Sequence, residues 1–254
     1  MPTRTARTTW TGGLQDGTGI GRAVAARTVA DGAAVVVAGR REDVGERAAA
    51  ELRGSGGRAL FVASDVTVEA DVARLVETAV REFGRLDGAF NNVGGVAATG
   101  PVHARSGRDW RADLDQNLTS VFYSLKFQIP AIAAAGGGSI VNNASIGGVR
   151  GIAGMSGYVA AKHGVVGLTR SAALEGAARG VRANALVTGN ADTPLYRRLL
   201  GAPAEGDLPG PAPNPTGRVA GPDEIAAFVA FLLSDESAFI TGAALAIDGG
   251  STAQ

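Results

Sequence analysis

Residues Thr8 to Ala23 read TTWTGGLQDGTGIGRA. The glycines of this stretch stand between a Thr-rich segment and the start of a helical pattern of small residues. Such glycines let the backbone approach a pyrophosphate, and the N-terminus of the following helix supplies oriented N–H groups and positive potential. The stretch therefore predicts a phosphate-binding loop, with Thr18, Gly19, Ile20 and Gly21 as candidate contacts.

Short apolar runs alternate with helical patterns along the rest of the chain. The predicted strands cover residues 33–38, 59–63, 86–90, 139–143, 181–186 and 244–248, and the clearest helical patterns cover 42–53 and 68–83. Continuous apolar strands separated by helices are typical of a parallel sheet that is covered on both faces. We expect one α/β domain over residues 1–254, a doubly wound, Rossmann-like parallel sheet whose ligand binds beyond the carboxyl ends of the strands.

The composition argues against several classes of function. The 254 residues are 45% hydrophobic, and 24 Lys and Arg balance 24 Asp and Glu, which leaves no electrostatic footprint for nucleic acid. The chain has no cysteine and only two histidines, His103 and His163, so a Cys- or His-based metal centre is not expected. No apolar run approaches the ~20 residues that span a bilayer. We expect a cytoplasmic protein without membrane or nucleic-acid partners.

The end of the second predicted strand bears on the choice of nucleotide. It reads Gly39-Arg40-Arg41, about twenty residues after the glycine loop, where a dinucleotide fold meets the adenosine ribose. An acidic residue there would bind the ribose hydroxyls of NAD, whereas an Arg can pair with the 2′-phosphate of NADP. Arg40 favours NADP(H) over NAD(H), although it can also be a solvated loop cation.

A group of polar residues with a characteristic spacing follows in the second half of the chain. Tyr158 and Lys162 are four residues apart, which places a phenol and an ammonium on one face of a helix. Ser145 precedes Tyr158 by thirteen residues and follows a predicted strand. Together with the strand-end sequence Asn91-Asn92-Val93-Gly94 and with Asn117, this pattern resembles the short-chain dehydrogenase/reductase family.

The resemblance extends over nearly the whole chain and implies specific roles. Asn117, Ser145, Tyr158 and Lys162 match the catalytic tetrad of the family in order and spacing. The implied cofactor contacts, besides the glycine loop and Arg40, are Asp65, Val66, Asn91, Gly94, Tyr158, Lys162, Gly189 and Thr193. The C-terminal segments Ile240-Thr241-Gly242 and Asp248-Gly249-Gly250 match a further signature. Members of the family are commonly tetramers, so a homo-tetramer or dimer is expected.

The chemistry follows from the residue types. Hydride transfer to a carbonyl leaves charge on oxygen, which requires a proton donor and a second hydrogen-bond donor. Tyr158 is the candidate acid/base, but a free phenol has a pKa near ~10. Lys162 and the positive ring of an oxidised nicotinamide are expected to lower that pKa. Ser145 is expected to hold the substrate oxygen, and the resemblance implies a proton relay through Asn117. The sequence predicts an NAD(P)-dependent enzyme that interconverts a ketone or aldehyde with an alcohol.

The glycine loop departs from the spacing of the family, which is Thr-Gly-x-x-x-Gly-x-Gly. If Gly19 and Gly21 are aligned with the last two glycines of this pattern, Gln15 occupies the place of the first glycine. A second alignment places Gly13, Gly17 and Gly19 at the three glycine positions. If Thr11 and Gly12 are aligned with the Thr-Gly that begins the pattern, the loop has three extra residues before Gly19. We favour this expanded loop, with Gly12 or Gly13 at its entrance.

The segment before the loop is also unusual. The first strand of this fold is central and normally apolar, but residues 4–10 contain no Val, Ile or Leu and include Arg4 and Arg7. An atypically placed, poorly ordered or weakened first strand is therefore expected.

Two alternative functions remain at this point. One is a 3-oxoacyl-carrier reductase, and the other is a non-catalytic nucleotide-binding or scaffolding protein with the same fold. The Pro- and Gly-rich residues 201–217 belong to a segment, 190–217, that is expected to form a lid or loop on the substrate side.

Overall fold

The computed structural model describes residues 8–12, 19–210 and 212–253. Within this part of the chain, seven strands form one parallel sheet in the order β3-β2-β1-β4-β5-β6-β7. The strands are β1 Thr8–Gly12, β2 Ala34–Gly39, β3 Arg58–Ala63, β4 Gly88–Asn91, β5 Gly138–Asn143, β6 Val181–Thr188 and β7 Ala244–Ile247. The chain builds outward from β1 to β3 and then returns to build the other half from β4. The predicted doubly wound fold is confirmed.

The polar first strand occupies the centre of the sheet. Thr9 pairs with Val35 of β2 on one side and with Gly88 of β4 on the other. Thr8 and Thr9 are buried, and the backbone N–H of Thr8 donates to the carboxylate of Asp87 at 2.9 Å. The expectation of an atypically placed strand is therefore wrong for residues 8–12. Threonine is compatible with a strand, and Arg4 and Arg7 lie outside the described residues.

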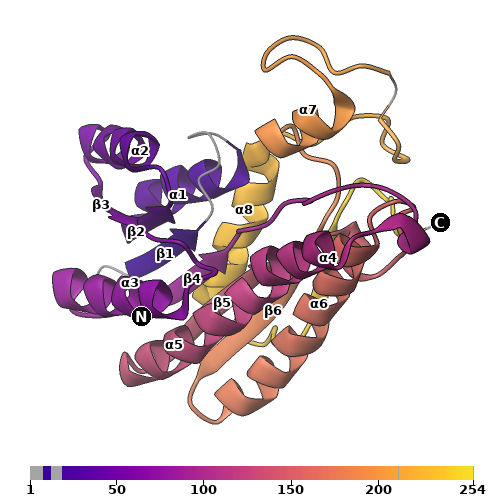
Figure 1. The fold of residues 1–254 in the computed structure, drawn as a ribbon. Coiled ribbons are helices and arrows are strands. Elements are labelled where there is room, and N and C mark those ends of the chain that lie inside the picture. Colours follow the sequence, from indigo (N-terminus) through magenta and orange to yellow (C-terminus); the bar gives the residue numbers. More distant parts are fainter. Residues whose placement is uncertain (1–7, 13–18, 211, 254) are drawn as a thin grey trace.

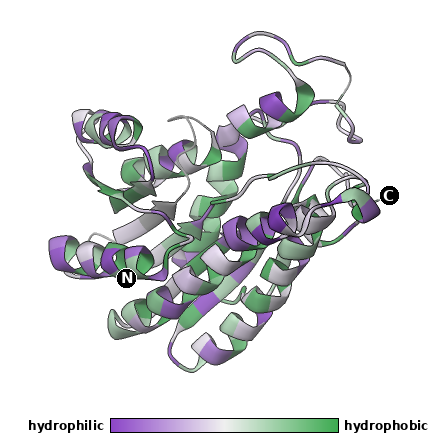
Figure 2. Ribbon diagram, viewed as in Figure 1, coloured by the Kyte–Doolittle hydropathy of each residue, from purple (hydrophilic) through white to green (hydrophobic). Residues whose placement is uncertain are grey.

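Helices cover both faces of the sheet (Figure 1). One face carries α1 Ile20–Ala30, α2 Glu42–Gly54 and α8 Pro222–Leu233; the other carries α3 Glu69–Phe83, α5 Ser120–Ala134 and α6 Ser156–Ala177. Beneath α8 the core includes Val24, Phe90 and Ile225, and beneath α5 and α6 it includes Val121 and Val165. Hydrophobic residues line α8, whereas the short helix α4, Gly107–Leu114, is largely hydrophilic (Figure 2).

The connections at the carboxyl ends of the strands position the site. Helix α4 runs into α5 through a π-helical turn, Asp115–Thr119. Helix α7, Pro194–Leu200, follows β6, and the described residues 201–210 and 212–219 after it are irregular (Figure 1). Short 3-10 turns occupy Val102–Ala104, Ile146–Gly148 and Asp235–Ser237. Among the described residues, no helix has the length and hydropathy required to cross a membrane.

A buried polar network ties strands β4 and β5 to helices α5 and α6. The side-chain amide of Asn91 donates to Gln128 at 3.0 Å and to Asn142 at 2.7 Å, and Gln128 donates back at 2.9 Å. Asn142 in turn donates to the hydroxyl of Thr169 at 2.9 Å. These side chains are at most 4% exposed. A buried network of this kind stabilises a fold when its members are satisfied.

Replacing Gln128 by Leu is expected to lower the free energy of unfolding by about 2–3 kcal/mol, because the buried carbonyl of Asn91 loses its partner. Urea unfolding of the two proteins measures the difference. Lys126→Leu is the matched control on the same helix. Its exposed ion pair with Glu69 is expected to contribute less than about 1 kcal/mol. An unchanged unfolding midpoint in Gln128→Leu would contradict this role for the network.

Candidate active site

The candidate site is a cleft along the carboxyl ends of the strands. A hollow of about 100 Å³ adjoins a larger one of about 820 Å³, and the two share Val93 and Leu195 in their linings. The smaller hollow contains six of the predicted residues: Gly19, Ile20, Gly94, Tyr158, Lys162 and Thr193. The larger contains Arg40, Asp65 and Val66. The cleft lies where ligands bind in open α/β sheets.

The N-terminus of α1 opens onto the smaller hollow. Gly19 precedes the helix with φ of 86°, a left-handed conformation that favours glycine, and among the described residues no side chain caps the helix. The N–H groups and positive end of a helix N-terminus are suited to a phosphate. Gly12 ends β1, and Gly21 is buried in the first turn of α1. The predicted contacts Gly13 and Thr18, like the rest of the expanded loop, lie outside the described residues.

Three of the four predicted catalytic residues converge beside this helix. Tyr158 and Lys162 share α6, and the Nζ atom of Lys162 lies 5.6 Å from the centroid of the Tyr158 ring. The Tyr158 hydroxyl is hydrogen-bonded to Ser145, which follows β5. Lys162 is 3% exposed and donates to the backbone carbonyl of Asn143 at 2.8 Å. A phenol, a hydroxyl and an ammonium therefore meet at the end of β5.

Burial controls the ionisation of these groups in the protein alone. It lowers the pKa of Lys162 from 10.5 to about 8. It raises the pKa of Tyr158, an effect that the hydrogen bond from Ser145 opposes and the charge of Asp113 reinforces. The sequence predicts that Lys162 and an oxidised nicotinamide together lower the pKa of Tyr158. In the protein alone desolvation of the phenolate is the larger effect, and the combined effect of Lys162 and the cofactor stays a prediction.

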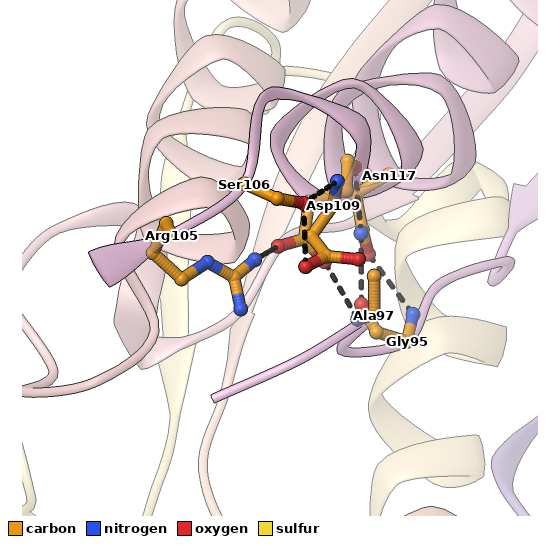
Figure 3. Close-up of polar contacts among 7 residues, drawn as sticks. Gly95, Ala97, Arg105, Ser106, Asp109 and Asn117 are labelled. Carbon is orange, nitrogen blue, oxygen red and sulfur yellow. Dashed lines mark hydrogen bonds and ion pairs between the residues drawn. The ribbon is translucent and has the colours of Figure 1, made fainter. Parts of the chain in front are cut away.

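Asn117 shapes the cleft through its side chain (Figure 3). Its amide group donates to the carbonyl of Gly95 at 2.8 Å, and its carbonyl accepts from the N–H of Gly95 at 3.1 Å. A Cβ on Gly94 would lie 2.7 Å from the Asn117 Oδ1 atom and 3.1 Å from the Lys162 Nζ atom. The absence of a side chain at Gly94 therefore leaves room for both Asn117 and Lys162 beside this residue.

Two of the predicted cofactor contacts lie elsewhere. The side chain of Asn91 belongs to the buried network, and the neighbouring Asn92 lines the cleft instead. Asn92 accepts from Asn143 at 2.6 Å, and Asn143 accepts from Thr188 at 2.5 Å. Consecutive residues of a strand point to opposite faces, which is the signal that separates Asn92 from Asn91.

Gly189 packs against the C-terminal segment. A Cβ at this position would lie 2.6 Å from the Cα atom of Asp248, and its N–H donates to Ile247 at 3.0 Å. Among the described residues, Gly189 does not line either hollow. Its position allows close packing of β6 against the segment after β7.

The cleft fits a nicotinamide dinucleotide. The helix N-terminus at Gly19 suits a pyrophosphate, and Arg40 and Asp65 lie in the larger hollow where an adenosine would be held. The hydroxyl of Ser64 is buried there without a hydrogen-bond partner among the described residues, so a polar ligand atom would satisfy it. The described residues contain no cluster of His, Asp or Glu that would hold a metal ion.

Comparison with known proteins places the chain in a family. Residues 13–252 match the family model described as enoyl-(acyl carrier protein) reductase. Cyclohexanol dehydrogenase of Acinetobacter sp. (strain SE19) is 41% identical, over 94% of this chain and 92% of that one. The chain belongs to the short-chain dehydrogenase/reductase family.

Further relatives of this short-chain dehydrogenase/reductase agree on the reaction type. Cis-4-hydroxycyclohexanecarboxylate dehydrogenase of Sinomonas cyclohexanicum is 45% identical, over 92% of this chain and 93% of that one. The crystal structure of levodione reductase superposes with a TM-score of 0.89 at 35% identity, and the match covers 97% of this chain and 98% of that one. The protein is an NAD(P)-dependent oxidoreductase that acts on CH–OH and C=O groups. A 3-oxoacyl-carrier reductase and a non-catalytic scaffold are not favoured.

Proposed function

We propose that this enzyme interconverts alicyclic secondary alcohols and ketones, with Tyr158 as the acid/base. The meeting of Tyr158, Ser145 and Lys162 at the end of the cleft carries the catalytic part of the proposal. The names of two relatives, which refer to cyclohexanol and to a hydroxycyclohexanecarboxylate, support the substrate class. Apolar side chains in the lining beside Tyr158, Val93 and Leu195, suit a hydrocarbon ring.

Two residues of the chain act on the substrate oxygen: one transfers a proton and the other orients the substrate. When bound, the nicotinamide ring supplies or accepts the hydride. Tyr158 donates its hydroxyl proton to the substrate oxygen in reduction and accepts a proton in oxidation. Ser145 donates a hydrogen bond to the same oxygen and so orients the substrate. In the protein alone burial raises the pKa of Tyr158, which favours the protonated phenol that ketone reduction requires. The proton relay through Asn117 remains a prediction.

Loss or gain of reduced-nicotinamide absorbance tests the proposal directly. The purified protein is incubated with cyclohexanol and either oxidised cofactor, and with cyclohexanone and either reduced cofactor. Turnover of cyclic substrates at higher kcat/KM than of open-chain alcohols and ketones of equal carbon number is the expected result. Equal or lower kcat/KM for the cyclic members of each pair would contradict the substrate class.

We propose NADP(H) as the preferred cofactor, on the basis of Arg40. Its guanidinium is 73% exposed at the rim of the larger hollow and 4.0 Å from Asp65. The side chain is therefore accessible to a 2′-phosphate, which an Arg can bind through two parallel hydrogen bonds.

Replacing Arg40 by Asp is expected to lower kcat/KM for NADPH by about 10- to 100-fold, since a charged hydrogen bond is lost and a repulsive charge is gained. The ratio of kcat/KM values for NADPH and NADH measures the change. Arg47→Asp, on the exposed side of α2, makes the same charge change away from the cleft. Equal effects of the two substitutions would remove Arg40 from cofactor selection.

Residues 190–217 are proposed as a lid on the substrate side. Arg197 of α7 binds the carboxylate of Asp192 through Nε at 2.6 Å and Nη2 at 2.7 Å. The same guanidinium donates to the carbonyls of Pro203 and Gly206 at 2.9 and 3.0 Å. These bonds attach the irregular chain to the helix beside the cleft, which supports movement of the two as a unit.

A homo-tetramer or dimer in the cytoplasm is proposed for the assembly and its location. Large apolar side chains are exposed at Phe122 of α5, Leu174 of α6 and Phe239, the last two at 83% and 104%. Exposed apolar side chains of this size are typical of subunit contacts when they form one patch. The cytoplasmic location follows from dependence on the dinucleotide pool of the cell.

A further inference from the structure

A buried ion pair lies next to the start of the catalytic helix. Arg105, in the loop before α4 (Figure 3), contacts Asp113 of α4 with 2.5 Å between Nη2 and Oδ2. Their side chains are 6% and 0% exposed. Burying two charges is costly unless they are paired. A buried ion pair beside the candidate site therefore suggests a role in that site.

Asp113 holds the loop that forms one wall of the cleft. Its Oδ1 atom accepts from the N–H of Ala97 at 2.8 Å, and its backbone carbonyl accepts from Asn117 at 2.8 Å. The side chain of Asn117 in turn forms two hydrogen bonds with the backbone of Gly95. One carboxylate and one amide thus fix residues 95–97 to α4 and the π-helical turn.

The same carboxylate touches the helix that carries Tyr158. A Cβ on Gly157 would lie 2.5 Å from the Oδ2 atom of Asp113, so α6 approaches the carboxylate closely at the residue before Tyr158. The groups that act on Tyr158 from the packed elements are Lys162 of α6, Ser145 after β5 and Asp113 of α4. A negative charge at Asp113 opposes ionisation of the phenol unless a positive charge compensates it.

Arg105 is placed to provide that compensation. Its Nε and Nη1 atoms are buried and have no hydrogen-bond partner among the described residues, so Asp113 is the described partner of this guanidinium. Within the described chain the other charged groups of α4, Arg108, Asp109 and Arg111, belong to residues that are exposed or half-buried. The buried pair therefore has no net charge, whereas either member alone would place a full charge beside α6.

We propose that Arg105 and Asp113 are positioning residues of the reaction. Asp113 fixes the 95–97 loop and packs against the start of α6, and Arg105 offsets part of the charge that this carboxylate presents to Tyr158. The inference rests on the proposed role of Tyr158 as acid/base.

Ionisation of Tyr158 tests the proposal without any catalytic turnover. The chain has three tyrosines, so the ultraviolet absorbance of tyrosinate, titrated with and without Tyr158→Phe, isolates this phenol. Arg105→Met is expected to raise its pKa by about half a unit to one unit, and Asp113→Asn to lower it by a similar amount. The double variant Arg105→Met/Asp113→Asn is expected to titrate near the wild type. Arg108→Met and Asp109→Asn, matched changes on the same helix, are expected to shift it by less than about 0.2 units.

Shifts of the same sign in the two single variants, or no shift in either, would overturn the proposal. If the single variants are folded but too unstable to titrate, urea unfolding of the wild type, the two single variants and the double variant decides instead. A double variant more stable than either single one supports the pair, and additive destabilisation overturns it. The titration needs no substrate, so it tests the roles of Arg105 and Asp113 separately from the proposed function. The proposed function is contradicted by a different result, which is retained turnover in Tyr158→Phe.

Discussion

Tyr158→Phe is expected to lower kcat for ketone reduction by about three orders of magnitude, in line with the contribution of general acid catalysis. The substitution removes one hydroxyl from a position where it meets Ser145 and leaves the ring in place. The dissociation constant for NADPH, measured by its fluorescence, is expected to change by less than about two-fold, because the ring still packs against the cleft.

The matched control is Tyr123→Phe, a half-buried tyrosine of α5 that packs against Phe122 at 5.7 Å between ring centroids. This variant is expected to retain full turnover. A Tyr158→Phe protein with more than a tenth of wild-type kcat would remove Tyr158 from the chemistry. An equal loss in both variants would show that the effect is one of folding.

Local apolar patterns were sufficient to predict most of the sheet. The runs at 34–38 and 139–143 lie in central strands because the side chains on both of their faces are covered by helices. The first strand was harder, since nothing in residues 8–12 signals burial. Its place depends on Val35 and Gly88, whose pairing with Thr9 bridges long stretches of chain, and on the carboxylate of Asp87.

The site residues that the sequence predicted are likewise those whose sequence spacing indicates a contact. The four-residue spacing of Tyr158 and Lys162 on one helix was legible from the sequence, and the structure brings them together with Ser145. The ion pair of Arg105 and Asp113 was missed, because an Arg and an Asp eight residues apart indicate no contact. An acidic residue four positions before Asn117 on a buried helix face was the available signal.

Lys162→Met is expected to abolish most of the activity and yet stabilise the protein near pH 7. The pKa of Lys162 falls from 10.5 to about 8, a burial penalty of roughly 3 kcal/mol at ~1.4 kcal/mol per unit. Met fills the same space without a charge, and the lost hydrogen bond to Asn143 offsets about 1 kcal/mol of the gain. A net increase of about 2 kcal/mol in the free energy of unfolding follows at pH 7. The loss in kcat is expected to be at least about 100-fold.

The pH dependence has a defined sign. A lysine whose pKa is lower in the folded state destabilises that state fully below about pH 8, and the penalty is relieved as pH rises towards 10.5. The advantage of Lys162→Met over the wild type is therefore expected to shrink above about pH 8 and to vanish near pH 10. Urea unfolding at about pH 7 and pH 10 measures this, with Lys126→Met, at the exposed lysine of α5, as the control. A variant that is less stable than the wild type at pH 7 would contradict the burial penalty. A more stable but inactive variant would mean that the buried ammonium is retained at the expense of stability for what it does beside Tyr158.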